Sequence, residues 1–192
     1  MKPAHRPLSR VTTFAAAIAS LTTCGLLAGC GESETPASAA AGAAAAPTMA
    51  LDIAIMQGDN QAAYAHVFAG TPVNTKTMTG DTPLHIAAAL GRVYAAEVLI
   101  GAGAELEVTN ASGVTPLFNA AFFGHADVLH RLIEAGGDTS ATDQTGAPIL
   151  EIMEMPWEQI SPIYEMVYSS IGLPFDEQRI KEARPRVAEL LR

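Results

Sequence analysis

The chain has 192 residues, of which 49% are hydrophobic and 16% are charged, and its formal net charge is −9. Residues 49–178 hold 16 Asp and Glu against three Lys and Arg, a net of −13, whereas residues 179–192 have a net of +3. Nucleic-acid binding requires Lys and Arg to neutralise phosphates, so we expect no nucleic-acid partner for this acidic body. The acidity favours a basic partner, or it keeps the protein soluble.

The chain begins with the pattern of an export signal. Lys2, Arg6 and Arg10 occur in a segment without acids, and the apolar run VTTFAAAIASLTTCGLLAGC follows over residues 11–30. A basic segment followed by an apolar run is typical of a signal peptide, which the mature protein no longer contains. We therefore assign residues 1–29 to a signal and leave them out of the fold.

This run ends in a short motif. Leu27-Ala28-Gly29-Cys30 resembles the lipobox of bacterial lipoproteins, in which the cysteine is lipidated and becomes the first mature residue. The resemblance implies a lipid anchor on Cys30, with palmitate among its acyl chains. Cys24 lies inside the signal, so the mature chain has no second thiol for a disulfide. An ordinary signal, cleaved later near the alanines of residues 37–46, is the alternative.

Residues 30–48 are predicted to be a lipidated cysteine followed by a flexible tether. The segment GESETPASAAAGAAAAPT, residues 31–48, contains almost no large apolar side chain and cannot bury a core. As a flexible chain it would span roughly 25 Å. An alanine-rich helix is the alternative for part of this segment.

A period of 33 residues dominates the rest of the chain. It aligns three glycine ladders, one leucine ladder and one alanine ladder in a single register. The members are Gly80, Gly113 and Gly146; Gly58, Gly91 and Gly124; Gly70, Gly103 and Gly136; Leu51, Leu84, Leu117 and Leu150; and Ala54, Ala87 and Ala120. Self-similarity at a fixed period of this length predicts a repeat architecture.

Each unit predicts two helices and an extended loop. Thr82 can cap the free N–H groups of a helix, and Pro83 suits the first helical turn. The first helix, about residues 83–90, ends at Gly91, which can adopt a left-handed terminating conformation. Residues 93–101 carry apolar side chains at helical spacing and predict the second helix.

The start of this unit resembles a known repeat. Thr82-Pro83-Leu84-His85-Ile86-Ala87 resembles the signature hexapeptide of the ankyrin repeat, and Thr115-Pro116-Leu117-Phe118-Asn119-Ala120 departs from it only at the histidine position. The resemblance implies an all-α ankyrin-repeat solenoid of helix-turn-helix units with extended loops. We expect about four units in residues 49–175, and their ranges are 49–79, 80–112, 113–145 and 146–175.

The outer units have drifted from this pattern. The first lacks the Thr-Pro start, and the last has Trp157 where the turn glycine would stand. End repeats lack a neighbour on one side and need a modified outer face. Residues 176–192 are predicted to form a C-terminal capping helix, which Pro185 would interrupt or restart.

The resemblance implies a structural role for the motif residues. In this family the histidine of the motif, here His85, bonds to the threonine side chain and the neighbouring loop. The residues expected to build the fold are Thr82, Pro83, His85, Gly91, Thr115, Pro116 and Gly124.

We expect no enzyme, no cofactor and no metal site. The chain has no Gly-rich phosphate loop, no Gly-x-Ser-x-Gly elbow and no Cys-His pairing. The least favoured alternative is a hydrolase or metal-binding protein that uses His125, Asp127 and His130. The two histidines are five residues apart on one helix rather than the four that would align two ligands.

A partner would meet the concave face, which the resemblance assigns to the first helices and the loop tips. The expected partner-binding residues are Met56, Met78, Asp81, Ala89, Leu90, Val114, Phe122, Phe123 and Met155. We expect Phe122 and Phe123 to be the anchors, because exposed aromatic side chains dominate binding energies. Packing of these rings against the tether, Trp157 or the drifted fourth unit is the alternative.

The sequence thus predicts a membrane-anchored, monomeric protein–protein interaction module in the bacterial cell envelope. Gly31, rather than an aspartate, follows Cys30, which resembles sorting to the periplasmic face of the outer membrane. The protein partner is of unknown identity and is expected to be basic or to carry an apolar patch. The resemblance implies two alternative roles: an immunity protein that neutralises a secreted antibacterial effector, or an accessory factor for a periplasmic stress-defence enzyme.

Overall fold

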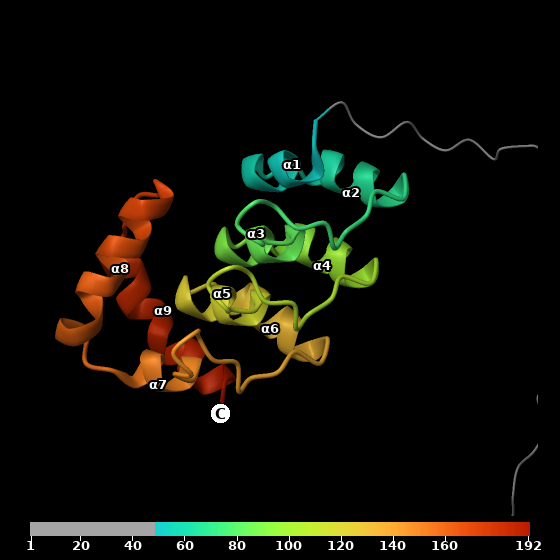
Figure 1. The fold of residues 1–192 in the computed structure, drawn as a ribbon. Coiled ribbons are helices and arrows are strands. Elements are labelled where there is room, and N and C mark those ends of the chain that lie inside the picture. The colour runs from blue at the N-terminus through green and yellow to red at the C-terminus, as the bar shows by residue number, and fades with distance from the viewer. Residues whose placement is uncertain (1–48) are drawn as a thin grey trace, which may run out of the picture. The chain divides into compact units, whose positions relative to one another are not determined.

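The structure is a computed structural model that describes residues 49–192, so the predicted signal, Cys30 and the tether lie outside the described residues. Over residues 49–192 the chain forms nine helices and no strand, apart from an isolated bridge between Thr142 and Pro148. This confirms the predicted all-α fold class, a solenoid of stacked helix pairs (Figure 1). The helices are α1 (Leu51–Gln57), α2 (Asn60–Phe68), α3 (Pro83–Ala89), α4 (Val93–Gly101), α5 (Pro116–Phe122), α6 (Ala126–Glu134), α7 (Ile149–Glu154), α8 (Trp157–Ile171) and α9 (Glu177–Leu190). Within this part of the chain, no helix combines the length and apolar character needed to cross a membrane.

The two central pairs begin and end in the same way. Thr82 precedes α3 and Thr115 precedes α5 with extended backbone, and a proline takes the first helical position of each. Proline suits this position because its missing N–H would have no helical partner. The turns to α4 and α6 pass through Gly91 and Gly124, whose φ angles of 66° and 72° strain any residue with a side chain.

Small residues let these pairs stack closely. The inner helices α1, α3 and α5 pack in succession, as do the outer helices α2, α4 and α6. Ala54, Ala87 and Ala120 lie fully buried along the inner helices, and Leu84 and Leu117 fill the core beside them. The 33-residue period is therefore realised as one continuous core, because each unit buries its apolar face only against its neighbours.

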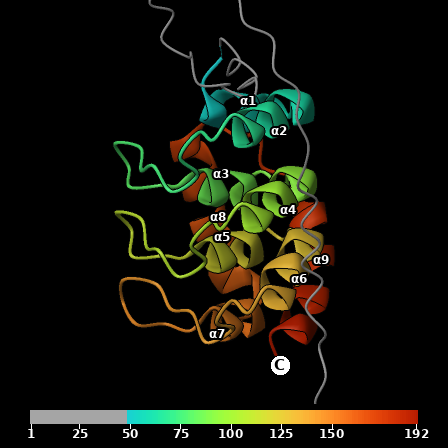
Figure 2. The same ribbon diagram turned by 90° about the vertical axis from the view of Figure 1, so that its right-hand side faces the viewer.

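Three long loops, between α2 and α3, α4 and α5, and α6 and α7, project to the same side of the stack (Figure 2). Consecutive loops are joined by side chain to backbone hydrogen bonds. The Asn74 side-chain oxygen accepts from the Glu105 N–H at 3.0 Å, and the Glu107 carboxylate accepts from the Asp138 N–H at 2.9 Å. The Glu107 carboxylate therefore helps to hold the second and third loops together.

The fourth helix pair is split in the chain. The sequence places it in residues 146–175 with a separate cap after it, but α9 rather than α8 packs against both α6 and α7. The α9 helix runs through Pro185 and buries Ile180 and Val187 against the stack. It is therefore at once the outer helix of the last pair and the end cap.

A recurring hydrogen bond supports this assignment of α9. A side chain at the start of α4, α6 and α9 donates to a backbone carbonyl at the end of the inner helix of the preceding pair, that is, of α1, α3 and α5 respectively. The pairs are Arg92 Nη2 with Met56 at 2.9 Å, His125 Nε2 with Ala89 at 3.0 Å, and Arg179 Nη1 with Phe123 at 3.2 Å.

The α8 helix is an insertion between α7 and α9. At the position of the turn glycine the chain has Met155, Pro156 and Trp157, and the first two have extended backbone with ψ near 140°. The chain therefore leads away from the stack instead of turning back. Gly172, with φ of 70°, and Pro174 lie between α8 and α9. In Figure 1, α8 stands beyond the end of α5, apart from the stacked pairs.

Candidate partner-binding face

The ends of the inner helices form two ladders in the 33-residue register. The first consists of Met56, Ala89 and Phe122, and the second of Gln57, Leu90 and Phe123. Met56 is 49% exposed, and Ala89 and Leu90 are half-buried. Phe122 and Phe123 retain only 9% and 7% of their surface. We call these two series the inner ladder; it is open at its N-terminal end and covered at its C-terminal end.

The cover is α8. The ring of Tyr164 stacks on Phe122 with 4.6 Å between ring centres, and Tyr168 meets Phe123 edge to face at 5.4 Å. This corrects the expectation that Phe122 and Phe123 form an exposed strip. Aromatic rings that are buried against each other stabilise the fold beyond the effect of their buried area. The inserted helix supplies the rings that pair with Phe122 and Phe123.

These contacts belong to a larger group, which we call the aromatic cluster. Its members are Phe118, Phe122, Phe123, Trp157, Tyr164, Tyr168 and Phe175. Burial raises the pKa of both tyrosines, so their hydroxyls stay protonated at neutral pH. The Tyr168 hydroxyl accepts from Arg179 Nη2 at 3.0 Å, whereas the buried Tyr164 hydroxyl has no hydrogen-bond partner among the described residues.

The two expected loop residues, Met78 and Asp81, differ in how much of their side chain is free to contact a partner. Met78 is fully exposed at the tip of the first long loop. Asp81 is half-buried, and its carboxylate accepts from the Thr79 hydroxyl at 2.6 Å and from the Asn110 side-chain amide at 2.7 Å. The Asp81 carboxylate therefore holds two neighbouring loops, and Met78 is the loop residue with free apolar surface.

Of the two remaining residues of the expected face, Val114 is buried and Met155 is half-buried. Val114 is 8% exposed, and its carbonyl accepts from the His85 ring at 3.1 Å. Met155 is half-buried, and its carbonyl accepts from Arg184 Nη2 at 2.7 Å. Of the nine expected partner-binding residues, the structure thus leaves two well exposed, Met56 and Met78, and four partly exposed, Asp81, Ala89, Leu90 and Met155.

The motif histidine lies inside the stack. His85 is fully buried, and its Nδ1 accepts from the Thr82 N–H at 3.1 Å while lying 2.9 Å from the Thr82 hydroxyl. Its Nε2 therefore carries the proton and donates to the Val114 carbonyl. Burial lowers the pKa of His85, so the ring is neutral and joins the start of α3 to the next loop.

His125 has a similar joining role. Burial, with the nearby charges of Arg179 and Arg92, lowers the pKa of His125 to about 4. The neutral ring donates from Nε2 to the Ala89 carbonyl at the end of α3. A neutral, donating imidazole at this joint holds two repeats together.

The other members of the alternative hydrolytic or metal-binding group are engaged elsewhere. His130 Nδ1 lies 3.3 Å from Glu134, and the Asp127 carboxylate accepts from Arg186 at 2.9 Å. Over residues 49–192, no three His, Cys, Asp or Glu side chains are grouped in a way that could hold a metal ion. The structure does not bring His125, Asp127 and His130 together as one site.

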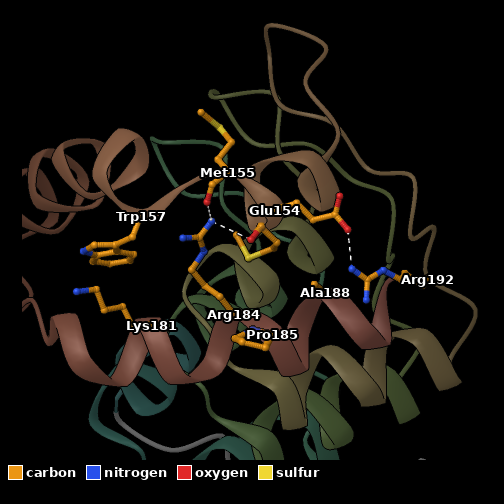
Figure 3. A pocket seen from close by; sticks show the side chains of 9 residues that line it. Glu154, Met155, Trp157, Lys181, Arg184, Pro185, Ala188 and Arg192 are labelled. Carbon is orange, nitrogen blue, oxygen red and sulfur yellow. Dashed lines mark hydrogen bonds and ion pairs between the residues drawn. The ribbon is translucent and has the colours of Figure 1, made fainter.

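A hollow of about 390 Å³ lies between the end of α7 and α9 (Figure 3). Arg184 Nη2 reaches into its wall and donates to three carbonyls, those of Ile152, Met153 and Met155, at 2.9, 2.8 and 2.7 Å. The Lys181 ammonium lies 5.0 Å from the centre of the Trp157 ring. These contacts satisfy the free carbonyls at the end of α7, so the hollow belongs to the joint that fixes α9 to α7.

The outer surface of α8 is an apolar feature that the sequence reasoning missed. Ile163, Met166 and Ile171 are 40%, 65% and 48% exposed, while Tyr164 and Tyr168 face the stack. The signal was present: apolar residues recur every three to four positions across residues 160–171. The 33-residue register places this segment in a drifted fourth repeat and does not indicate an inserted helix with a second apolar side.

A comparison with protein families agrees with this geometry. The family model for ankyrin repeats matches three copies over residues 51–143, which hold α1 to α6. Residues 51–143 are thus similar to three ankyrin repeats, and over residues 49–192 the fold is an all-helical repeat solenoid. Ankyrin repeats imply a protein–protein interaction module, and proteins built from them are generally binding modules rather than enzymes. A comparison with curated proteins found no match.

Proposed function

We propose that this protein is a membrane-anchored module that binds a partner protein in the bacterial envelope. The proposal rests on one observation, which is that α8 packs on the inner ladder. Phe122 and Phe123 already accept an apolar helix of the same chain. The ladder continues to Leu90 and Met56, which keep apolar surface free. A helical segment of a partner can extend this contact in the manner of a helix bound in a groove.

The anchor is a proposal from the sequence alone. Cys30, at the end of the Leu-Ala-Gly-Cys motif, would carry the lipid, and residues 31–48 would tether the repeats near the periplasmic face of the outer membrane. Several acyl chains on one residue give stable membrane binding. Labelled palmitate should enter the wild-type protein and not a Cys30→Ser variant. Equal labelling of both would rule out Cys30 as the lipid site.

Two roles fit such a module, and they predict different partners. An immunity protein would bind and neutralise a secreted antibacterial effector, whereas an accessory factor would support a periplasmic stress-defence enzyme. The products of neighbouring genes are the natural candidates. Inhibition of a purified effector would support the first role, and a more stable or more active enzyme would support the second.

The binding function is tested by capture from envelope extracts with the tagged protein. A Met56→Ser/Leu90→Ser variant should lose the partner, because both changes remove apolar surface from the open ladder. Tyr94→Ser is the matched control, since Tyr94 is 44% exposed but lies on the outer helix α4. Equal capture by all three proteins would show that the ladder is not the binding face. Failure of the wild type to capture any specific protein would contradict the binding function itself.

A further inference from the structure

The α8 helix is apolar on two sides. Ile160, Tyr164 and Tyr168 face the stack and are buried, but Ile163 and Met166 on another side are exposed. At about 100° per residue, Ile163, Met166 and the half-buried Val167 share a sector roughly 100° wide. We call Ile163, Met166, Val167 and the nearby Ile171 the α8 flank. A helix that is apolar on several sides is normally covered on all of them.

The repeat stack gives no reason for this second apolar side. The last helix pair is completed by α9, which packs against α6 and α7 and repeats the side chain to carbonyl bond of the earlier pairs. The aromatic cluster holds α8 through Tyr164 and Tyr168 on its inward side, and Val167 adds a partly buried contact with the core. The exposed apolar surface of the flank is therefore in excess of what the fold needs, and exposed apolar patches of this kind mark interaction sites.

The charges around the flank define the partner. Residues 149–171 contain four glutamates and no Lys, Arg or His. Three of them, Glu151, Glu158 and Glu165, are exposed and have no ion-pair partner within the described part of the chain. Glu158 and Glu165 lie roughly 20° apart on the helix, and they follow Met166 at about 80° and 100° around the helix, on the border of the flank. The surface thus presents an apolar strip with an unneutralised acidic edge.

We propose that the α8 flank docks an apolar helix of a partner protein that carries Lys or Arg beside its apolar face. The proposal rests on the proposed binding function and adds a second contact surface, besides the inner ladder, and the chemistry of the partner. A second copy of this chain fits poorly, because residues 49–192 have 18 acids against eight Lys and Arg, a net of −10, and copies repel one another. An anionic membrane surface is repelled by the same glutamates.

The test uses the full purified chain and a fluorescent 18-residue synthetic helix of Leu and Lys, followed by anisotropy. A Leu and Glu helix of the same length is the control peptide. The Leu/Lys helix should bind, and Ile163→Ser/Met166→Ser should weaken it at least tenfold. Glu158→Gln/Glu165→Gln should weaken it several-fold and reduce its dependence on salt. Phe68→Ser/Tyr94→Ser, which removes similarly exposed rings from α2 and α4, should leave binding unchanged.

Several outcomes would overturn the proposal. These are unchanged affinity in the Ile163→Ser/Met166→Ser variant, equal binding of the Leu/Glu helix, or no binding of the Leu/Lys helix. Preferential binding to phosphatidylglycerol vesicles, or a dimer that this variant abolishes, would assign the flank to a membrane or a second copy instead. Trp157, the single tryptophan, stacks on Tyr164, so unchanged fluorescence shows that α8 is still seated. If this variant still captures the partner found with wild-type protein, the flank is excluded while the binding function stands.

Discussion

The central pairs α3 to α6 and the C-terminal helices α7 to α9 follow the same 33-residue register but are held together differently. In the central pairs, alanines and turn glycines let the backbones approach, and Ala87 and Ala120 are fully buried. In the C-terminal region, large aromatic rings span the distance between α5 and the inserted α8. A solenoid can thus accept an extra helix at a turn if the outer helix, although it comes later in the sequence, still packs in its usual position. Here α9 does so and keeps the hydrogen bond from Arg179 to the Phe123 carbonyl.

The largest expected difference between the two regions concerns two equivalent positions of the inner ladder, Leu90 and Phe123. Phe123 and Leu90 stand 33 residues apart in the same place, but only Phe123 is covered by α8. Phe123→Ala should lower the free energy of unfolding by about 3–5 kcal/mol, because it empties a buried site. Leu90→Ala should cost only about 1 kcal/mol, because the side chain is half-buried. Urea denaturation followed by circular dichroism measures both.

Equal losses for the two variants would mean that α8 adds nothing to the burial of the ladder. Phe123→Ala could also shift the urea transition that is followed by tryptophan fluorescence without shifting the one followed by circular dichroism. It would show that α8 leaves its seat while the repeats stay folded, because Trp157 lies at the start of α8.

The second prediction concerns the joint between α7 and α9. Arg184 is 7% exposed and donates to three carbonyls, so Arg184→Met should leave these carbonyls unpaired and lower the free energy of unfolding by about 3 kcal/mol. Methionine keeps much of the apolar stem, so the loss reports the guanidinium. Arg186→Met, two residues along α9, removes only an exposed pair with Asp127 and should cost less than about 1 kcal/mol. Similar urea midpoints for the two variants would contradict the capping role of Arg184.

These two regions also differ in how far the sequence could predict them. The helices of the central pairs were predictable nearly to the residue, because Thr82, Pro83 and Gly91 act locally and fix where a helix starts and ends. The same local signals do not say what covers a surface. Phe122 and Phe123 fit the concave face by register, and only the tertiary path of residues 155–171 shows that α8 buries them.

The sequence contains one sign of the inserted helix, but the 33-residue register does not explain it. Trp157 in place of the turn glycine indicates that the tight turn is lost, yet it does not indicate where the chain goes next. The long-range bonds that decide it, from Arg179 and Arg184 on α9, join residues far apart in the sequence. Such pairings depend on packing rather than on local preference, so a single sequence does not reveal them.

The third prediction uses pH to distinguish the hydrogen bond of His125 between helix pairs from the equivalent hydrogen bond of Arg179. His125 joins α6 to α3 as a neutral ring with its pKa lowered to about 4, whereas α9 is joined to α5 by the hydrogen bond from Arg179 Nη1 to the Phe123 carbonyl. The unfolded chain binds a proton at His125 near pH 6.5 and the folded chain does not, so its stabilisation is complete above pH 6.5 and is lost as the pH falls toward 4. Between pH 7.5 and 4.5 this contribution should fall by on the order of 2 kcal/mol.

His125→Gln isolates this contribution, because glutamine can still donate to the Ala89 carbonyl but does not titrate. The variant should lose less stability than the wild type between the two pH values, as measured by urea denaturation. The buried His85 is present in both proteins and cancels in the difference. Parallel pH profiles for wild type and His125→Gln would contradict the assignment.

The smallest expected effect lies within the aromatic cluster and differs in sign between two tyrosines. The Tyr164 hydroxyl is buried and has no hydrogen-bond partner among residues 49–192, so Tyr164→Phe removes an unsatisfied polar group and should be neutral or stabilising by up to about 1 kcal/mol. Tyr168→Phe removes the acceptor of Arg179 Nη2 and should be destabilising by about 1 kcal/mol. Thermal unfolding of the two variants under identical conditions compares them directly. A destabilising Tyr164→Phe would mean that its hydroxyl has a partner in solution, such as bound water, and that α8 is held by more than ring packing.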